Sequence, residues 1–256
     1  MNILLIGDVV GKVGRRAIAC LLPEIRRNHD LDIVIANGEN AAGGKGLTPS
    51  TADEMFEAGV EIITSGNHIW RYNEIYPYLD SEAPVLRPLN YPEGAPGRGV
   101  LCHNGIAVIN LMGRTFMPGA LDCPFRGADD ALANIGDCDI VIVDMHAEAT
   151  SEKAAMAWYL DGRVSAVIGS HTHIPTADAR VLPKGTAFVT DVGMVGSRDS
   201  ILGVVRQPVI DAFLNQLPAR FTTDEHGPVV FNSVLIQVDE ASGRATGIQR
   251  IDRELT

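Results

Sequence analysis

Cysteines with metal-binding spacing are missing from the chain. Its four cysteines stand at Cys20, Cys102, Cys123 and Cys138, and no two of them form a C-x-x-C pattern. This spacing argues against a structural zinc knuckle and against a disulfide framework. We therefore expect reduced thiols that are mostly buried.

The chain also has fewer basic than acidic residues. The 256 residues include 21 Lys and Arg against 32 Asp and Glu, which gives a formal net charge of -11. An acidic balance of this size argues against an extended nucleic-acid surface. It leaves room for a small anionic ligand, because a bound metal ion can reverse the sign of the charge locally.

Long hydrophobic runs are the third absence. No run approaches the ~18 apolar residues that a membrane span requires. The first apolar run is preceded by no basic segment and is cut short at Asp8, so it predicts a strand and not a signal peptide. We expect a cytoplasmic protein with no membrane partner, and we find no internal repeat or low-complexity segment.

What the chain does contain is an alternation of buried strands and amphipathic helices. Hydrophobic residues make up 46% of the sequence and charged residues 21%, the balance of a globular protein with a substantial core. Strands at residues 3–7, 32–37 and 61–65 alternate with helices at 15–29 and 49–58. This alternation predicts an α/β layered fold. Further strands are expected at 99–102, 106–111, 140–144, 165–169, 187–190 and 233–238, with a second hairpin strand reaching residue 251.

Polar side chains follow five of these strands, where each strand ends. In open α/β sheets, ligand sites lie beyond the carboxyl ends of the strands, so residues distant in sequence can converge there. Oxygen and imidazole donors without thiolate favour Mn, Fe or Zn over soft-metal chemistry. The residues at the five ends are Asp8, Glu39 with Asn40, Asn67 with His68, His146, and His171 with His173.

The last of these ends carries the pattern His-Thr-His. On extended backbone His171 and His173 would project to the same side, where both imidazoles could address one metal ion or two neighbouring ions. Taken alone, the pair fits a metal site and a pair of hydrogen-bonded histidines about equally well. The other four strand ends favour the metal site, and their convergence favours two ions.

This ordered set of motifs resembles that of the calcineurin-like metallophosphoesterases. The matching segments are Gly7-Asp8, Gly38-Glu39-Asn40, Gly66-Asn67-His68, His146 and Ser170-His171-Thr172-His173. Within that superfamily the chain looks most similar to the bacterial branch described as 2′,3′-cyclic-nucleotide 2′-phosphodiesterases. The resemblance implies one domain over residues 1–256, built as a four-layer α-β-β-α sandwich with two mixed sheets.

The resemblance also implies a ligand set for two divalent ions, with Fe or Mn expected and Zn an option. One ion would take Asp8, Asn40 and His173, and Glu39 would bridge to the other. In such sites a water ionised by the metals attacks phosphorus in line. His68 would then be the general acid for the leaving 2′-oxygen, although a packing role for His68 stays open. The second ion would take Asn67, His146 and His171 beside the bridging Glu39.

Three positions depart from the wider superfamily. Val10 stands where the D-x-H motif has its histidine, Glu39 replaces the bridging aspartate, and Ile69 follows Asn67-His68 where an acidic residue is usual. Asn40 would substitute for the missing histidine, as the bacterial branch implies. The departures affect metal identity and affinity more than the reaction class.

Several functions remain open at this level. The leading prediction is a phosphodiesterase for a small cyclic nucleotide such as 2′,3′-cyclic AMP, with a phosphomonoesterase or a nuclease as close alternatives. A regulatory protein that binds metal and nucleotide with weak hydrolysis is the alternative from another class. The irregular segments 84–98 and 111–127 could form a lid or the contacts of a homo-oligomer. Lys45, in a glycine-rich loop, is a candidate for the mouth of the site, and Asp144 or Glu148 could orient His146.

Overall fold

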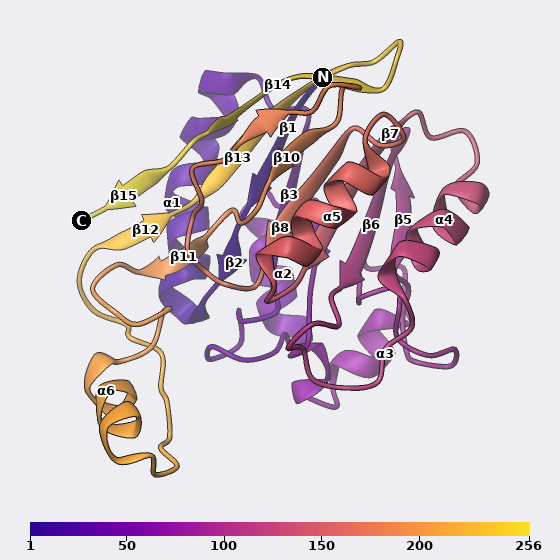
Figure 1. Cartoon of the computed structure of the whole chain (residues 1–256). Helices are drawn as coiled ribbons and strands as arrows, with labels where there is room; N and C mark the ends of the chain where they lie inside the picture. Colours follow the sequence, from indigo (N-terminus) through magenta and orange to yellow (C-terminus); the bar gives the residue numbers. More distant parts are fainter.

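A five-stranded mixed sheet contains the N-terminal strand β1 (Asn2–Ile6) at its centre (Figure 1). The computed structural model describes all 256 residues. β1 is parallel to β3 (Ile33–Asn37) on one side and antiparallel to β13 (Ser233–Asp239) on the other. The full order is β14-β13-β1-β3-β4, where β4 is Ile62–Thr64 and β14 is Arg244–Arg250.

A six-stranded mixed sheet faces the first one. Its three long strands β6, β7 and β8 run parallel, and β10 continues the parallel set next to β8. The edge strands β5 and β9 are antiparallel to their neighbours. In the order β5-β6-β7-β8-β10-β9 the strands are Val100–His103, Ile106–Met112, Ile140–His146, Ala166–Ser170, Ala187–Val189 and Arg180–Val181.

A third, smaller sheet was not predicted from the sequence. It arises because the chain leaves the first sheet at Gly7 and continues as β2 (Asp8–Val9), which pairs with β11 (Met194–Ser197). A Cβ on Gly7 would lie 2.0 Å from the carbonyl oxygen of Gly193, so only glycine permits this crossing. The order is β15-β12-β11-β2, with β12 at Val229–Phe231 and β15 at Arg253–Leu255.

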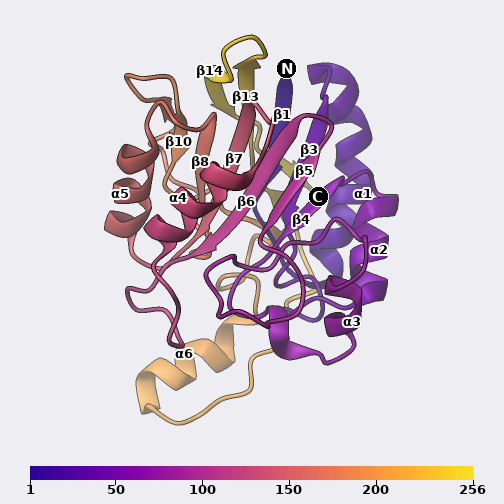
Figure 2. The same cartoon turned by 90° about the vertical axis from the view of Figure 1, so that its right-hand side faces the viewer.

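Helices cover the outer faces of the two larger sheets. In Figure 2, α1 and α2 lie on one side of the sheets, and α4 and α5 lie on the other. The helix predicted at 49–58 begins as expected, because the Thr48 hydroxyl accepts a hydrogen bond from the Thr51 backbone N–H and Pro49 occupies the first turn. The helices are α1 (Gly11–His29), α2 (Pro49–Glu57), α3 (Ile75–Leu79), α4 (Pro124–Asn134), α5 (Thr150–Leu160) and α6 (Arg206–Asn215), with a 3-10 turn η1 at Ile69–Arg71.

Alternating side chains divide the core into three hydrophobic clusters. Leu4 and Ile6 of β1 face α1 and α2, whereas Ile3 and Leu5 face the second sheet. In the second sheet, alternate residues of β6, β7 and β8 turn either toward the first sheet or toward α4 and α5. This period of two is the pattern of strands buried on both faces. The structure is thus a mixed α/β fold with several sheets and six α-helices.

The cysteines are more exposed than their sequence context indicated. The prediction of mostly buried thiols is wrong, since Cys20 and Cys102 are exposed and Cys123 and Cys138 are half-buried. Cys20 lies on α1 and Cys102 on the edge strand β5, whereas Cys123 and Cys138 lie in the loops before α4 and β7. As for the membrane, no helix is long and apolar enough to cross a bilayer.

The helices α3 and α6 were not predicted from the sequence. α6 belongs to an arm, residues 201–223, that stands apart from the sheets in Figures 1 and 2. The backbone closes the base of the arm, where Val205 N–H donates to Thr222 O and Asp224 N–H donates to Gly203 O, both at 3.0 Å. We refer to residues 201–223 as the α6 arm.

Candidate metal centre

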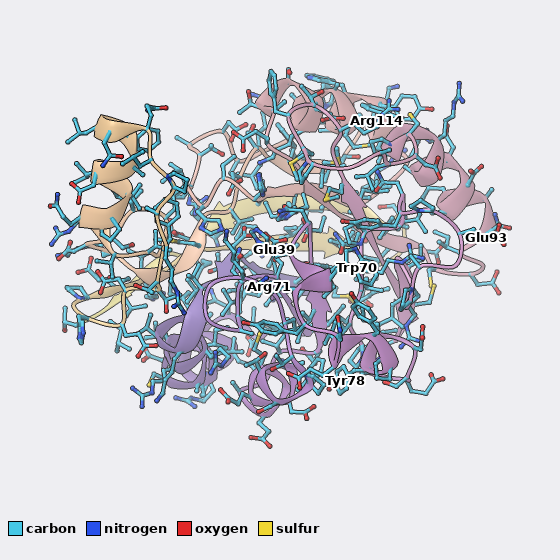
Figure 3. The ribbon with its side chains drawn as sticks, turned by 90° about the horizontal axis from the view of Figure 1, so that it is seen from below. Glu39, Trp70, Arg71, Tyr78, Glu93 and Arg114 are labelled. Atoms are coloured by element: carbon cyan, nitrogen blue, oxygen red, sulfur yellow. The ribbon has the colours of Figure 1, made fainter.

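All eight predicted site residues lie at one end of the sheets. β1, β3 and β4 are mutually parallel, as are β7 and β8. The carboxyl ends of the two sets meet, since Glu39 after β3 lies 3.3 Å from His146 at the end of β7. In the view from below, Glu39 lies near the middle of this end of the molecule (Figure 3). The convergence expected from the five strand ends is therefore present in the fold.

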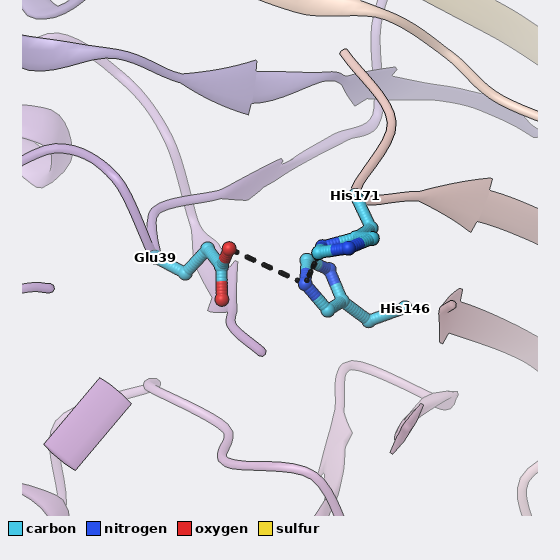
Figure 4. Close-up of side chains that lie close together, drawn as sticks. All are labelled: Glu39, His146 and His171. Carbon is cyan, nitrogen blue, oxygen red and sulfur yellow. Dashed lines mark hydrogen bonds and ion pairs between the residues drawn. The ribbon is translucent and has the colours of Figure 1, made fainter. Parts of the chain in front are cut away.

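Glu39 forms the centre of one half of the site. Its Oε1 lies 3.3 Å from His146 Nε2, and His146 Nε2 lies 3.1 Å from His171 Nδ1 (Figure 4). Asn67 completes this half, with Oδ1 3.3 Å from the same His146 nitrogen. One donor atom each from Glu39, His146 and His171 falls within 4.8 Å of the others, a spacing that suits a single metal ion.

Asp8, Asn40 and His173 form the other half. His173 Nε2 lies 3.1 Å from the amide nitrogen of Asn40 and 3.8 Å from Asp8 Oδ1. Asn40 also reaches Glu39 Oε1 at 3.3 Å, so Glu39 contacts both halves. The Asn40 oxygen faces His68, so ligation through that oxygen beside His173 requires the amide turned by about 180°.

Asp8 carries the clearest sign of a missing partner. Its side chain is fully buried, and Oδ1 accepts no hydrogen bond. Its other oxygen, Oδ2, accepts from the backbone N–H of His171 at 3.1 Å. A buried carboxylate oxygen without a donor is costly unless a cation supplies the interaction. Oδ1 therefore fits a metal ligand.

Each of the three histidines has one ring nitrogen held from outside the cluster. His146 Nδ1 lies 3.0 Å from Ser170 Oγ, whose proton goes to Asp144 Oδ1 at 2.6 Å. The Ser170 oxygen is thus left to accept a hydrogen bond from His146 Nδ1–H. In the neutral ring this hydrogen bond selects the tautomer whose unprotonated Nε2 faces Glu39, the form in which His146 would bind a metal ion.

His171 and His173 follow the same pattern with different acceptors. His171 Nε2 lies 3.1 Å from Glu148 Oε2, and His173 Nδ1 lies 3.1 Å from the carbonyl oxygen of Leu202. Donation to these acceptors leaves His171 Nδ1 and His173 Nε2 free, and both face into the cluster. Of the two residues that were candidates for orienting His146, Asp144 contacts it through Ser170, whereas Glu148 contacts His171 instead.

The backbone argument for the histidine pair was wrong. β8 ends at Ser170, and His171 and His173 have φ angles of 99° and 65°, far from extended backbone. The two rings converge because the chain turns sharply at both residues. Thr172 holds this turn in place, because its backbone N–H and its hydroxyl donate to Asp191 Oδ2 at 3.0 and 2.7 Å. Strain of this kind at a functional turn is maintained by the surrounding contacts.

His68 also adopts a conformation that the sequence did not indicate. It was placed on extended backbone, but its φ and ψ are -92° and -2° and it precedes η1. Its Nδ1 nevertheless lies 3.2 Å from Glu39 Oε1 and 2.9 Å from Asn40 Oδ1. His68 lines the cavity in front of the cluster, together with Lys45. Lys45 therefore lies where it was expected, at the mouth of the site.

Burial and the neighbouring charges shift the pKa values of four groups in the cluster. Burial raises the pKa of Asp8 to about 6. Burial also acts to raise the pKa of Glu39, but His146 and His68 outweigh it and hold that pKa well below its usual range. Burial and the neighbouring His146 lower the pKa of His171 to about 3, so His171 is neutral, the form that binds metal. For His146, burial is outweighed by Glu39, and the pKa rises to about 9.

Gly66 makes room for the cluster. A Cβ at this position would lie 2.1 Å from His146 Nε2 and 2.4 Å from Glu39 Oε2. No side chain fits there, so the space between β4 and the two ligand candidates is available only because residue 66 is glycine. The motif Gly66-Asn67-His68 gave no sign in the sequence of this role for its glycine.

Comparison with known proteins agrees with this geometry. The family described as YmdB-like protein matches residues 4–251. The chain belongs to the YmdB-like family. Its sequence is 47% identical over 256 residues to the 2′,3′-cyclic-nucleotide 2′-phosphodiesterase of Bacillus subtilis (strain 168), covering 98% of this chain and 96% of that protein. The resemblance to the bacterial metallophosphoesterase branch, predicted from the motifs, is confirmed at the level of the family.

Solved structures of similar proteins share the whole fold. A hypothetical protein from Thermus thermophilus superposes with a TM-score of 0.93 at 45% identity, and each chain is covered completely. A phosphatase from Mycoplasma pneumoniae also gives a TM-score of 0.93, at 34% identity, covering 99% of this chain and 93% of that one. The YmdB-like fold therefore extends over the α6 arm and the third sheet as well as the site.

Proposed function

We propose that this protein is a phosphodiesterase that uses two divalent metal ions to hydrolyse small cyclic nucleotides, with 2′,3′-cyclic AMP as the first substrate to test. The name of the Bacillus subtilis relative supports phosphoric ester hydrolysis. The observation that carries the metal requirement is the orientation of the histidines. His146, His171 and His173 each have an outer nitrogen held by an acceptor and an inner nitrogen facing the carboxylates.

The proposed ligand sets follow the two halves of the cluster. Asp8, Asn40 and His173 would hold one ion, and Glu39 would serve both because it contacts both halves. Oxygen and imidazole donors suit Fe or Mn, with Zn as a further option. Bound ions would polarise the phosphate and lower the pKa of a bound water toward about 7. The second ion would take Asn67, His146 and His171.

The chain itself supplies the proton for the leaving group. His68 borders the cavity and contacts Glu39 and Asn40, so it can face a phosphodiester seated over the cluster. We assign it the transfer of a proton from its imidazole to the leaving 2′-oxygen. Glu148 would keep His171 in the binding tautomer, and Ser170 with Asp144 would do the same for His146.

The proposal includes a single metallophosphoesterase domain arranged as four layers, helices-sheet-sheet-helices. The three hydrophobic clusters support this arrangement, since one lies between the two larger sheets and the other two lie beneath the helices on either side. The third sheet is an addition at one end of the first.

Metal analysis and a substrate panel test this function. Purified protein should contain about two metal ions per chain, by elemental analysis, a content drawn from two-metal sites in general. It should hydrolyse 2′,3′-cyclic AMP faster than nitrophenyl phosphate. Preference for the monoester would indicate a phosphomonoesterase, and preference for polynucleotides a nuclease. Tight nucleotide binding with negligible turnover would instead favour the regulatory protein.

A further inference from the structure

The cavity in front of the metal centre is polar on one side and apolar on the other. It has a volume of about 560 Å³, within the usual range of about 300–1,000 Å³ for small-molecule sites. Glu39, His68, His171 and His173 line the polar side. The α6 arm forms the opposite wall, which has no part in the proposed chemistry. Its lining residues include Leu202, Val209, Ala212, Phe213, Gln216 and Phe221.

One face of α6 is turned toward this cavity. Val209, Ala212 and Phe213 follow the spacing i, i+3, i+4, which places them on one side of the helix, and Gln216, its left-handed C-cap, also lines the cavity. The two phenylalanines of the wall are unusually open, since Phe213 is 76% exposed and Phe221 is 43% exposed. Aromatic rings exposed within a binding cavity provide a surface on which a planar ligand group can stack.

The α6 arm is also joined directly to the metal centre. Leu202, in the wall, accepts the hydrogen bond from His173 Nδ1 at 3.1 Å. Leu202 has a left-handed φ angle of 53°. The apolar wall of the cavity therefore begins at a residue that contacts a proposed metal ligand directly.

From these observations we infer that the α6 arm is the nucleobase subsite, in which Phe213 and Phe221 stack on the base of a nucleoside cyclic phosphate held at the metal centre. The inference rests on the proposed function and adds its specificity determinants. Gln216 caps the C-terminus of α6, and its Nε2 donates a hydrogen bond to the Phe213 carbonyl oxygen at 2.9 Å. The Gln216 amide oxygen and its second N–H are left for a base edge. Stacking is tolerant of base identity, so purine and pyrimidine esters should both be accepted.

The affinity for the reaction product tests the subsite without requiring turnover. The full-length protein loaded with Mn²⁺ is titrated with adenosine 3′-monophosphate and with methyl ribofuranoside 3-phosphate, which lacks the base. The wild type should bind the nucleotide at least about tenfold more tightly than the base-less ester. Phe213→Ala and Phe221→Ala should each reduce this preference about tenfold, the usual effect of losing one stacked aromatic.

Two further variants distinguish stacking from a structural role. Phe213→Trp keeps an aromatic surface and should retain the preference. Leu214→Ala removes an apolar side chain that is 78% exposed on α6 but does not line the cavity, so it should leave both affinities unchanged. Equal binding of both ligands by the wild type would overturn the inference. An equal loss of affinity for the nucleotide and for the base-less ester in Phe213→Ala would also overturn the inference.

Hydrolysis, base-dependent binding and oligomer size together distinguish a nucleobase subsite from the proposed phosphodiesterase activity and from a dimer contact at α6. Hydrolysis of 2′,3′-cyclic AMP without base-dependent binding would leave the phosphodiesterase and remove the subsite. Base-dependent binding without hydrolysis would leave the subsite and remove the phosphodiesterase. A smaller oligomer for both Phe213→Ala and Leu214→Ala in size-exclusion chromatography would show that a second copy covers the helix, and the inference would fall.

Discussion

Lys153 Nζ donates a hydrogen bond to Asp191 Oδ2 at 2.8 Å, and both side chains are completely shielded from solvent. Lys153 belongs to α5, and Asp191 follows β10. The same Asp191 oxygen accepts both hydrogen bonds of Thr172, the residue between the two histidines of the turn. This buried ion pair therefore links an outer helix to the backbone that places His171 and His173.

Replacing Lys153 by methionine should destabilise the protein strongly. The substitution removes the only cation that the buried Asp191 carboxylate contacts, and breaking a buried pair typically costs about 3–5 kcal/mol. Urea denaturation should show this loss in the free energy of unfolding. Arg163→Met is the matched control, because the ion pair of Arg163 with Asp129 is about 40% exposed on both sides and should contribute less than ~1 kcal/mol. Equal losses in the two variants would contradict the role of burial.

Gly66→Ala should weaken metal binding while the fold persists. The added methyl would lie 2.1 Å from His146 Nε2, so either the ring or β4 has to move. We expect metal content to fall below about half of the wild-type value and turnover to fall at least about a hundredfold. Elemental analysis and circular dichroism measure these effects. Gly127→Ala in α4 should change neither, since its nearest neighbour would be 3.7 Å away.

His68→Ala tests the proton donor. Loss of a general acid typically lowers turnover by about 10²–10⁴-fold, and we expect a decrease in that range for 2′,3′-cyclic AMP. Metal content should stay near that of the wild type, because His68 belongs to neither proposed ligand set. Loss of metal from this variant would make His68 a ligand instead. His226→Ala, on an exposed loop, serves as the control.

Metal binding should stabilise the folded protein. Ions that bind only the native state stabilise it by about 2.7 kcal/mol at a free concentration a hundred times the Kd. Chelator-treated protein should therefore show a Tm that rises with added Mn²⁺. Glu39→Gln removes the charge shared by both halves of the cluster and should abolish most of this rise. The control Glu54→Gln, at a half-exposed position of α2, should keep the rise in Tm. A rise that persists in Glu39→Gln would show that the ions bind elsewhere.

The buried strands and their polar ends were predictable, for a physical reason. Strands buried on both faces appear as continuous apolar runs, and the side chains after them must converge when the strands are parallel. The polar ends after β1, β3, β4, β7 and β8 were found in this way. The backbone conformation at His171 and His173 was not predicted, because the positive φ angles of these two histidines are imposed by contacts such as that of Thr172 with Asp191.

Sequence patterns did not predict the α6 arm or the third sheet. α6 has no side-chain cap, and its apolar residues Ile210, Phe213 and Leu214 point to solvent or to the cavity, so they give no core-facing stripe. The third sheet depends on the close approach of Gly7 to Gly193, residues far apart in the chain. Contacts of this type leave no local periodicity.

The crossing at Gly7 has a consequence for shortened versions of the protein. Asp8 is held in place by β11, and β11 is held by β12, so the position of the first predicted ligand depends on strands close to the C-terminus. A fragment ending soon after His173 would contain every predicted ligand and still lack the neighbours that fix Asp8. The last part of the chain thus supports the residue that follows the first strand, and any shortened version that keeps the predicted ligands must also keep β11 and β12.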